Sequence, residues 1–233
     1  EFRRVLFRST PLAERPWQKV DTDLSYHRGK TYIIVVNYYS RFFEIDLLKS
    51  ATTEKHQPLK VVLLRHGIPE VTVSDNGPQF AASTFSKFAE EWGFTHLTSS
   101  PHYPQSNDEV ERAVKTAKDL IVKSEDPYLA LFQQIYPLEN GYTPVELLMG
   151  RKLRSTLPLA PEKLTPKLPN LKHLQKTERA HKLQQAENYN KPHRTSVLPE
   201  LNPCDKVWIP DKNSPAVVIQ KSPQPRSDIF KTQ

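Results

Sequence analysis

Three acidic residues of this chain stand where carboxylates could act together on a phosphate. Asp23 lies in the strand-like stretch WQKVDTDLSY, Asp75 directly follows the β-branched run VTVS, and Glu111 falls in the first turn of an expected helix. Clustered carboxylates repel one another unless cations lie between them, and oxygen ligands suit hard divalent ions, Mg²⁺ above all. Two such ions about 3.5–4 Å apart stabilise the attacking and leaving oxygens of an in-line phosphoryl transfer. Metal-dependent phosphoryl transfer is therefore one interpretation of the trio.

Each acid also has an ordinary structural explanation. A buried charge without a partner costs several kcal/mol, so Asp75 at the end of a buried strand needs a metal, or it caps the next helix or holds the turn at Asn76-Gly77. Asp23 could be a polar residue of an edge strand, and Glu111 an acid favoured near a helix N-terminus by the macrodipole. Because the chain has 26 acids, spacing alone leaves both explanations open.

The hydrophobic pattern predicts the elements that position these acids. Runs rich in β-branched and aromatic residues indicate strands over 17–26, 31–39, 41–48, 71–74 and 94–100, and apolar residues at helical spacing indicate helices over 53–66, 81–92 and 108–124. Three strands, helix, strand, helix, strand, helix is an α/β order with a mixed sheet. If the fourth strand lies beside the first, Asp23 and Asp75 converge, and the last helix can supply Glu111.

The character of the chain changes after Gly150. Residues 151–233 hold 16 Lys and Arg against 7 Asp and Glu, a net of +9, whereas residues 1–150 hold 17 against 19. Such a basic segment indicates a polyanion partner, usually nucleic acid, or a solvated charged linker. Residues 170–190 predict a mostly polar helix exposed to solvent. KVWI and AVVI predict short strands, although the absence of glycine beyond residue 150 is awkward for the tight turns of a small barrel.

We expect four parts in the chain of 233 residues. Residues 1–9, EFRRVLFRS, resemble the translation of a sequencing adaptor and are set aside as an artefact; a genuine basic arm is the alternative. Residues 10–150 form the α/β core, residues 151–199 a basic, proline-rich and helical linker, and residues 200–233 a small β module. The single cysteine, Cys204, excludes an intrachain disulfide and a Cys-based zinc site. No apolar run approaches the ~20 residues that span a bilayer, so no membrane partner is expected.

Five sequence blocks carry a resemblance to a known family. They are WQKVDTDL, VVNYYSRF, RHGIPEVTVSDNGPQF, HYPQSNDEVERAVKTAK and GYTPVELLMGRKLRSTLP, in this order. They resemble the integrase of gypsy-type LTR retrotransposons, within the retroviral integrase superfamily. The resemblance covers residues 11–160 well and 160–233 loosely. The 35 residues that separate Asp75 from Glu111 match the family's spacing.

The resemblance implies a ribonuclease H-like mixed sheet flanked by helices, with a partial SH3-like module at residues 200–233. It further implies a DDE polynucleotidyl transferase that uses two Mg²⁺ or Mn²⁺ ions to process the 3′ ends of DNA and transfer them to target DNA. Asp23, Asp75 and Glu111 match the catalytic, metal-binding acids. Asp21 competes for the first position, and we prefer Asp23 because the family places this acid six residues after the tryptophan, here Trp17. Strand alternation does not decide, because Asp21 and Asp23 face the same side.

Residues for DNA contact follow from the same helix and the loop before it. Lys115 and Lys118 lie at i+4 and i+7 from Glu111, on its own face, where they suit DNA phosphates or form a solvated helix face. The resemblance makes residues 101–107 a mobile active-site loop, so that Tyr103, Gln105 and Asn107 are candidate DNA contacts. It also implies binding to element ends and target DNA, a homo-oligomer, and a nuclear location after passage through the cytoplasm.

Several positions depart from the family. Asp108 and Cys204 stand where the family has glycine, and residues 125–140 form a shorter segment than usual. The amino-terminal His/Cys zinc domain is not found in this sequence. These departures favour a truncated or decaying copy whose acids are intact. The alternatives to an active integrase are a non-catalytic, transposon-derived DNA-binding protein and an inactive relic.

Overall fold

The structure is a computed structural model, and its description extends to residues 13–48, 57–75, 77–81, 83–98, 108–156, 158–193, 201–209, 214–221 and 228–232. The chain divides into two compact units, one of residues 7–189 and one that contains residues 190–233. Each unit is described by itself. No helix in the described ranges is long and apolar enough to cross a membrane.

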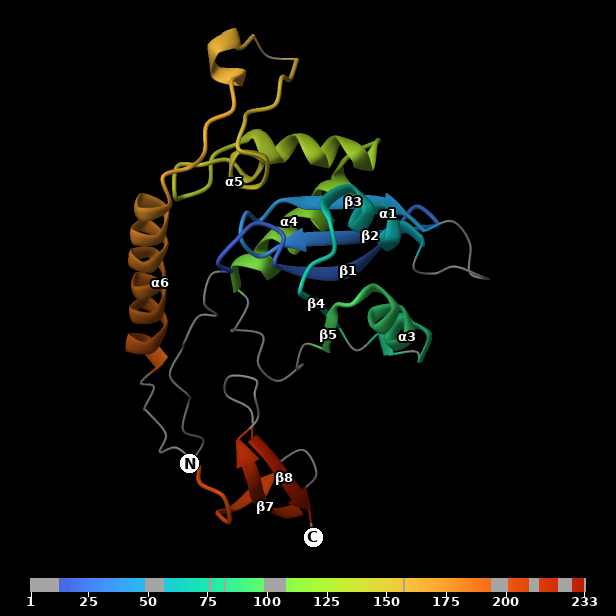
Figure 1. Cartoon of the computed structure of the whole chain (residues 1–233), viewed down its shortest axis with the longest axis vertical. Helices are drawn as coiled ribbons and strands as arrows, with labels where there is room; N and C mark the ends of the chain where they lie inside the picture. Colours follow the sequence, from blue (N-terminus) through green and yellow to red (C-terminus); the bar gives the residue numbers. More distant parts are fainter. Residues whose placement is uncertain are drawn as a thin grey trace. The chain divides into compact units, whose positions relative to one another are not determined.

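The first unit is built on a five-stranded mixed sheet with the order β3-β2-β1-β4-β5 (Figure 1). Its strands are β1 (Lys19–His27), β2 (Lys30–Asn37), β3 (Phe43–Leu47), β4 (Val71–Ser74) and β5 (Thr95–Thr98). The first three pair antiparallel as a meander, whereas β4 pairs parallel with both β1 and β5. The predicted mixed α/β sheet, with the fourth strand beside the first, is confirmed.

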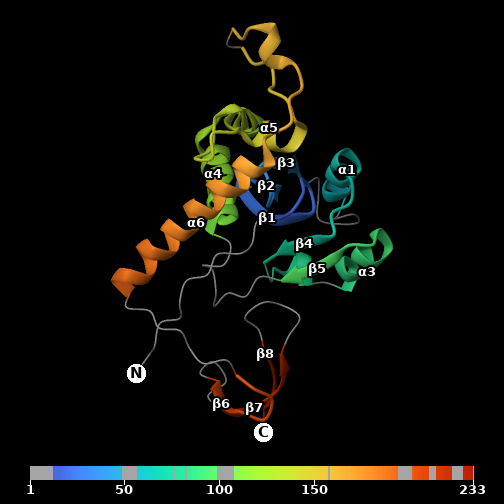
Figure 2. The same ribbon diagram turned by 60° about the vertical axis from the view of Figure 1, so that its left-hand side comes forward.

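The interior strand β2 separates two apolar layers. Its side chains alternate between the faces of the sheet, so that Ile33 and Val35 join one buried cluster while Ile34 and Val36 join the other. Helices α1 (Gln57–His66) and α3 (Ser83–Trp92), the latter preceded by the short α2 (Pro78–Ala81), pack on the first face. Helix α4 (Asp108–Lys123) covers the second face, as the turned view in Figure 2 shows. This helix is the element that carries Glu111 toward the sheet.

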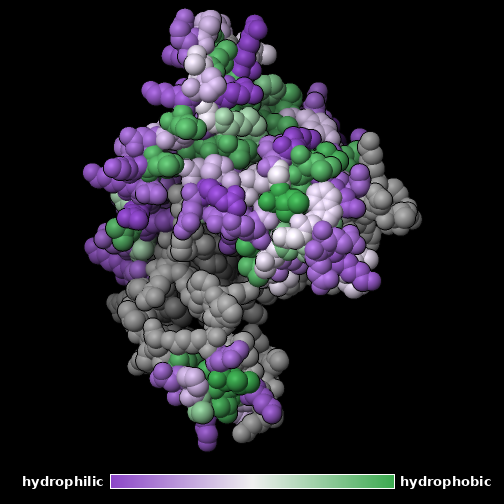
Figure 3. Space-filling model, in the orientation of Figure 1, coloured by the Kyte–Doolittle hydropathy of each residue, from purple (hydrophilic) through white to green (hydrophobic). Residues whose placement is uncertain are grey.

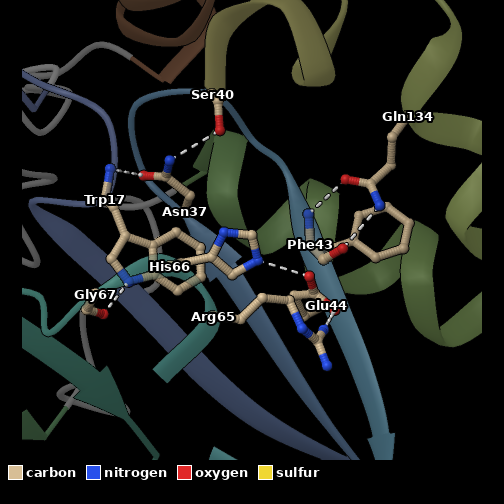
Figure 4. A network of polar contacts seen from close by, with 9 residues as sticks. All are labelled: Trp17, Asn37, Ser40, Phe43, Glu44, Arg65, His66, Gly67 and Gln134. Carbon is tan, nitrogen blue, oxygen red and sulfur yellow. Dashed lines mark hydrogen bonds and ion pairs between the residues drawn. The ribbon is translucent and has the colours of Figure 1, made fainter. Parts of the chain in front are cut away.

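The outer strand β3 is held by side chains from both sides of the sheet (Figure 4). Gln134, in the 3₁₀ helix η2 (Pro127–Ile135), accepts from the N–H of Phe43 and donates to its carbonyl, both at 2.8 Å. This amide pairs with backbone groups of an edge strand that would otherwise offer them to another chain. On the other side, Glu44 accepts from Arg65 at 2.6 Å and contacts His66 Nε2 at 2.7 Å.

The segment after α4 and η2 contains further helices. They are α5 (Pro144–Met149), the 3₁₀ helix η3 (Pro161–Leu164) and α6 (Leu171–His193). Helix α5 begins with a capping box between Thr143 and Glu146 and ends at Gly150, whose φ of 66° is left-handed. These signals fix the helix ends locally.

Helix α6 is not wholly exposed, which corrects the expectation of a solvated helix over 170–190. Figure 3 shows a largely hydrophilic outer surface there, as expected. Leu174 and Glu178, however, are buried, at 0% and 5% exposure. Glu178 forms an ion pair with Arg41, from the turn between β2 and β3, with Nη2 and Oε2 2.6 Å apart. The helix was misjudged because its composition is polar and its partner lies far away in sequence.

The second unit contains a three-stranded antiparallel sheet with the order β6-β7-β8. Its strands are β6 (Lys206–Ile209), β7 (Ser214–Lys221) and β8 (Asp228–Thr232). The strands expected for KVWI and AVVI are therefore present. Cys204, which precedes β6, has a φ of 78°, a conformation that favours glycine. An SH3-like module stays a prediction.

Candidate active site

The pairing of β1 with β4 sets the positions of the first two acids. Asp21 is level with Val73, and Thr22 with Ser74. Continuing this parallel register by one residue places Asp23 beside Asp75, which follows the end of β4. The predicted convergence of the Asp23 and Asp75 carboxylates stays a prediction, and Asp21 lies two residues further back along β1.

Asp75 lies in a turn in which side-chain ends approach Gly77 closely. Its Oδ1 accepts the N–H of Gly77 at 3.0 Å. A Cβ added at Gly77 would lie 2.8 Å from that same oxygen and 2.4 Å from Nε2 of Gln79, so no larger residue fits without a shift. Ser74 is buried, whereas Asp75 itself is exposed. The expectation that the Asp75 carboxylate is desolvated is therefore wrong, because the buried strand ends one residue before it.

Asp21 is an acid whose charged form the fold disfavours. Burial, repulsion from Asp23 and further repulsion from Glu111 and Asp75 together raise the pKa of Asp21 to about 7, against an opposing effect of Lys19. Repulsion from three other acids means that four carboxylates share one electrostatic region. Glu111, in the first turn of α4, is exposed to solvent. The fold thus concentrates negative charge where β1, the end of β4 and α4 approach each other.

A lysine neutralises part of this charge. Lys118 Nζ lies 2.6 Å from Oδ2 of Asp23, and the two side chains are 38% and 25% exposed. Lys118 therefore points from α4 toward β1. Lys115, also on α4, is exposed. An exposed pair of this kind contributes about 0–1 kcal/mol, so the contact can open readily.

The donor set suits a hard divalent cation, although its present spacing does not form a finished site. Carboxylate oxygens are the ligands that Mg²⁺ prefers, and the ammonium of Lys118 already occupies a cationic position beside Asp23. Among the described residues, no three His, Cys, Asp or Glu side chains gather closely enough to hold a metal ion. The residues fit the metal by chemistry, and binding would have to draw the carboxylates closer.

Some predicted site residues lie outside the described ranges, and one residue near the site, His96, was not predicted from the sequence. Asn76, Tyr103, Gln105 and Asn107 lie outside the described residues, so their roles stay predictions. The sequence reasoning overlooked His96 of β5, whose Nε2 lies 2.8 Å from the hydroxyl of Ser74. A histidine on the strand next to an acid-bearing strand is the signal that could have found it.

The order of the sheet and its covering helices define a ribonuclease H-like fold of the integrase type. A solved simian T-cell lymphotropic virus intasome, in complex with a PP2A regulatory subunit, is similar to this chain with a TM-score of 0.59 and 16% identity. The match covers 99% of this chain and 81% of that one. At this identity the likeness shows the fold.

Sequence relatives point the same way. An uncharacterized protein of Caenorhabditis elegans is 30% identical over 185 residues, which cover 73% of this chain and 15% of that protein. The Gag-Pol polyprotein of Walleye dermal sarcoma virus is 25% identical over 162 residues, 63% of this chain and 9% of the polyprotein. The chain thus spans only a small part of these relatives. No protein-family model matches it.

Fold and relatives together place the chain in the retroviral integrase superfamily. The fold and the relatives do not distinguish gypsy-type retrotransposon integrases from other members of this superfamily, so the gypsy type stays a prediction.

Proposed function

We propose that this chain is an integrase core that cleaves DNA ends and joins them to target DNA in a metal-dependent reaction. The observation that carries the proposal is the four-carboxylate region formed by β1, the end of β4 and the first turn of α4, which raises the pKa of Asp21 to about 7. Such repulsion is costly unless cations relieve it. Nucleic-acid phosphates held near cations are the substrate that this charge pattern suits.

The residues have separate tasks in this proposal. Asp23 on β1, Asp75 just after β4, and Glu111 on α4 would hold two Mg²⁺ or Mn²⁺ ions. When bound, the ions would stabilise the attacking and leaving oxygens at phosphorus. Lys115 would attract DNA phosphates from the exposed face of α4. Lys118 would leave Asp23 and pair with a phosphate, because the pair is weak and its stem is flexible.

The second candidate function is DNA binding without catalysis. It is favoured by the contact of Lys118 with Asp23 and by the absence of a finished metal cluster among the residues that the structure describes. Here Lys118 would be a permanent counter-ion. The basic segment at residues 151–233 would then account for the DNA affinity by itself.

The two functions are separated by strand-transfer assays on the full chain with Mg²⁺ or Mn²⁺ and a DNA end. Asp75→Asn should abolish the product while the circular dichroism spectrum and DNA affinity are kept. Glu90→Gln, an exposed acid on α3, is the matched control and should retain activity. Product formation by Asp75→Asn would remove Asp75 from the proposed site, and a parent chain that only binds DNA would favour the second function.

The same assay decides between the two candidates for the first acid. Asp23→Asn should abolish strand transfer, because Asp23 and Asp75 each follow directly after the last residues at which β1 pairs with β4, Thr22 and Ser74. Asp21→Asn should leave measurable activity and still bind DNA. The reverse result would assign the role to Asp21, and loss in both variants would mean that both carboxylates are needed.

A further inference from the structure

A buried hydroxyl stands directly before the proposed second acid. Ser74, the last residue of β4, has 0% exposure. Its Oγ donates to the carbonyl oxygen of Asp75 at 2.9 Å and lies 2.8 Å from Nε2 of His96. The hydroxyl thus links the main chain of Asp75 to a side chain of the neighbouring strand β5.

The single hydrogen of the Ser74 hydroxyl determines which group donates in each of its two hydrogen bonds. A serine hydroxyl has one hydrogen to donate and lone pairs with which to accept. If that hydrogen goes to the Asp75 carbonyl, His96 must carry a hydrogen on Nε2 and donate it to Ser74. The chain of donors then runs from the His96 ring through Ser74 to the Asp75 carbonyl.

The surroundings of His96 favour this arrangement. The half-buried ring packs edge-on against Phe85, with ring centroids 4.5 Å apart, so its position is fixed by the core. Burial lowers the pKa of His96, which keeps the imidazole neutral at physiological pH. A neutral ring with its hydrogen on Nε2 can donate to Ser74 without placing a cation in the core.

The Asp75 carbonyl needs such a fixed partner. The peptide plane that follows Asp75 leads into the turn in which Gly77 donates to the Asp75 carboxylate at 3.0 Å. The carboxylate is exposed, so packing does not hold it. Fixing the carbonyl limits rotation of the backbone at Asp75 and thereby limits the directions that the carboxylate can take.

We propose that His96, acting through the Ser74 hydroxyl, is a positioning residue that orients Asp75 for the reaction. This inference rests on the proposed function for its catalytic consequence. Its structural consequence, the fixed geometry of Asp75, can be measured without activity. The competing explanation is that His96 merely satisfies a buried hydroxyl and fills space against Phe85.

The test compares His96→Leu, which removes the donor, with His96→Gln, whose amide nitrogen can occupy the position of Nε2. Full-length variants are assayed for Mg²⁺-dependent strand transfer, with kcat and KM for DNA determined separately. His96→Leu should lower kcat about 10- to 100-fold, the usual effect of losing a group that orients a metal ligand. KM for DNA should change little, and His96→Gln should recover most of kcat.

Dependence on Ser74 is tested by a double-mutant cycle. Ser74→Ala should lower kcat as His96→Leu does, and adding His96→Leu to Ser74→Ala should cause little further loss. Additive losses would show that His96 does not act through Ser74. Equal activity of His96→Leu and the parent, or equal losses in the Leu and Gln variants, would overturn the proposal.

An independent readout separates failure of this inference from failure of the proposed function. Hydrogen exchange at the Gly77 amide, followed by NMR, reports the contact with the Asp75 carboxylate. Exchange should be several-fold faster in His96→Leu and near the parent rate in His96→Gln. If the parent transfers no strands, the proposed function fails, while the exchange rates still decide whether His96 positions Asp75. Unchanged exchange in His96→Leu would refute the positioning.

Discussion

The ion pair between α6 and the sheet domain offers a sharp test of how the basic segment is attached. Arg41 meets Glu178 with two parallel hydrogen bonds of 2.9 and 2.6 Å, and Asn140 donates to the same carboxylate at 2.7 Å. The two charged side chains are only 8% and 6% exposed. We predict that Glu178→Ala releases α6 from the domain.

The expected loss of stability depends on the cost of leaving the Arg41 charge buried without its partner and on the free energy with which α6 docks. Removing one partner of a buried ion pair typically costs about 3–5 kcal/mol, because the other charge stays desolvated. Helix α6 also buries Leu174, which contributes about 1.5–3 kcal/mol, and His181 contacts Glu139. Release of the helix would return water to Arg41. The observed loss is therefore limited to the docking free energy, and undocking of α6 is expected rather than unfolding of the sheet.

The assay is hydrogen exchange by mass spectrometry on peptides from residues 171–189. Glu178→Ala should abolish protection in these peptides and leave β2 protected, whereas Glu187→Ala, an exposed acid on the same helix, should change neither. The double variant Arg41→Met/Glu178→Leu replaces the pair by apolar groups and should restore docking, as buried pairs often allow. Unchanged protection in Glu178→Ala would show that the pair does not hold α6 and would refute the reasoning.

Three further predictions concern charge. Burial alone would raise the pKa of Glu44, but the hydrogen bonds and charges of His66 and Arg65 together outweigh it and lower the pKa. The stabilisation that Glu44 contributes is therefore present above its unfolded pKa and lost as pH falls through its folded pKa. Urea unfolding should find Glu44→Gln destabilised by about 1–3 kcal/mol at pH 7, with the difference from the parent shrinking below the ordinary pKa of 4.5; a constant difference would contradict this. Replacing Lys115 and Lys118 by alanine should weaken DNA binding equally for all sequences and reduce the salt slope by up to about two phosphate equivalents. An unchanged salt slope of DNA affinity would mean that Lys115 and Lys118 lie on a helix face that contacts solvent and not DNA. Because residues 151–233 carry +9, log affinity of the full chain should fall linearly with log salt, by about 0.9 per phosphate neutralised, and equal binding at low and high salt would refute this.

The sheet could be predicted from sequence because its signals are local. The run TYIIVVN is apolar on both faces, which is typical of a central strand, and it forms β2 between two buried clusters. Gly77 and Asp75 likewise stand two residues apart, so the turn that joins them is visible in SDNGPQF.

The docking of α6 could not be predicted in the same way. Arg41 and Glu178 are separated by 137 residues, and neither residue type is typical of a core. Among the side chains of this long polar helix whose burial the structure describes, Leu174 and Glu178 alone are deeply buried, too few to produce an apolar stripe. A buried ion pair is specified by the fold as a whole, because its charges are tolerable only when both partners arrive together.

The candidate site could be predicted from the sequence only in part. Sequence spacing identifies Asp23 and Asp75 separately, and the parallel pairing of β1 with β4 runs up to Thr22 and Ser74, the residues directly before the two acids. Alternation along β1 puts Asp21 on the same face, so the pattern cannot rank Asp21 against Asp23. The fold separates them by environment: Lys118 meets Asp23, whereas Asp21 lies further back and its pKa is raised to about 7. This difference arises from burial and from charges on three elements, and it makes Asp23, not Asp21, the carboxylate that already contacts a cation.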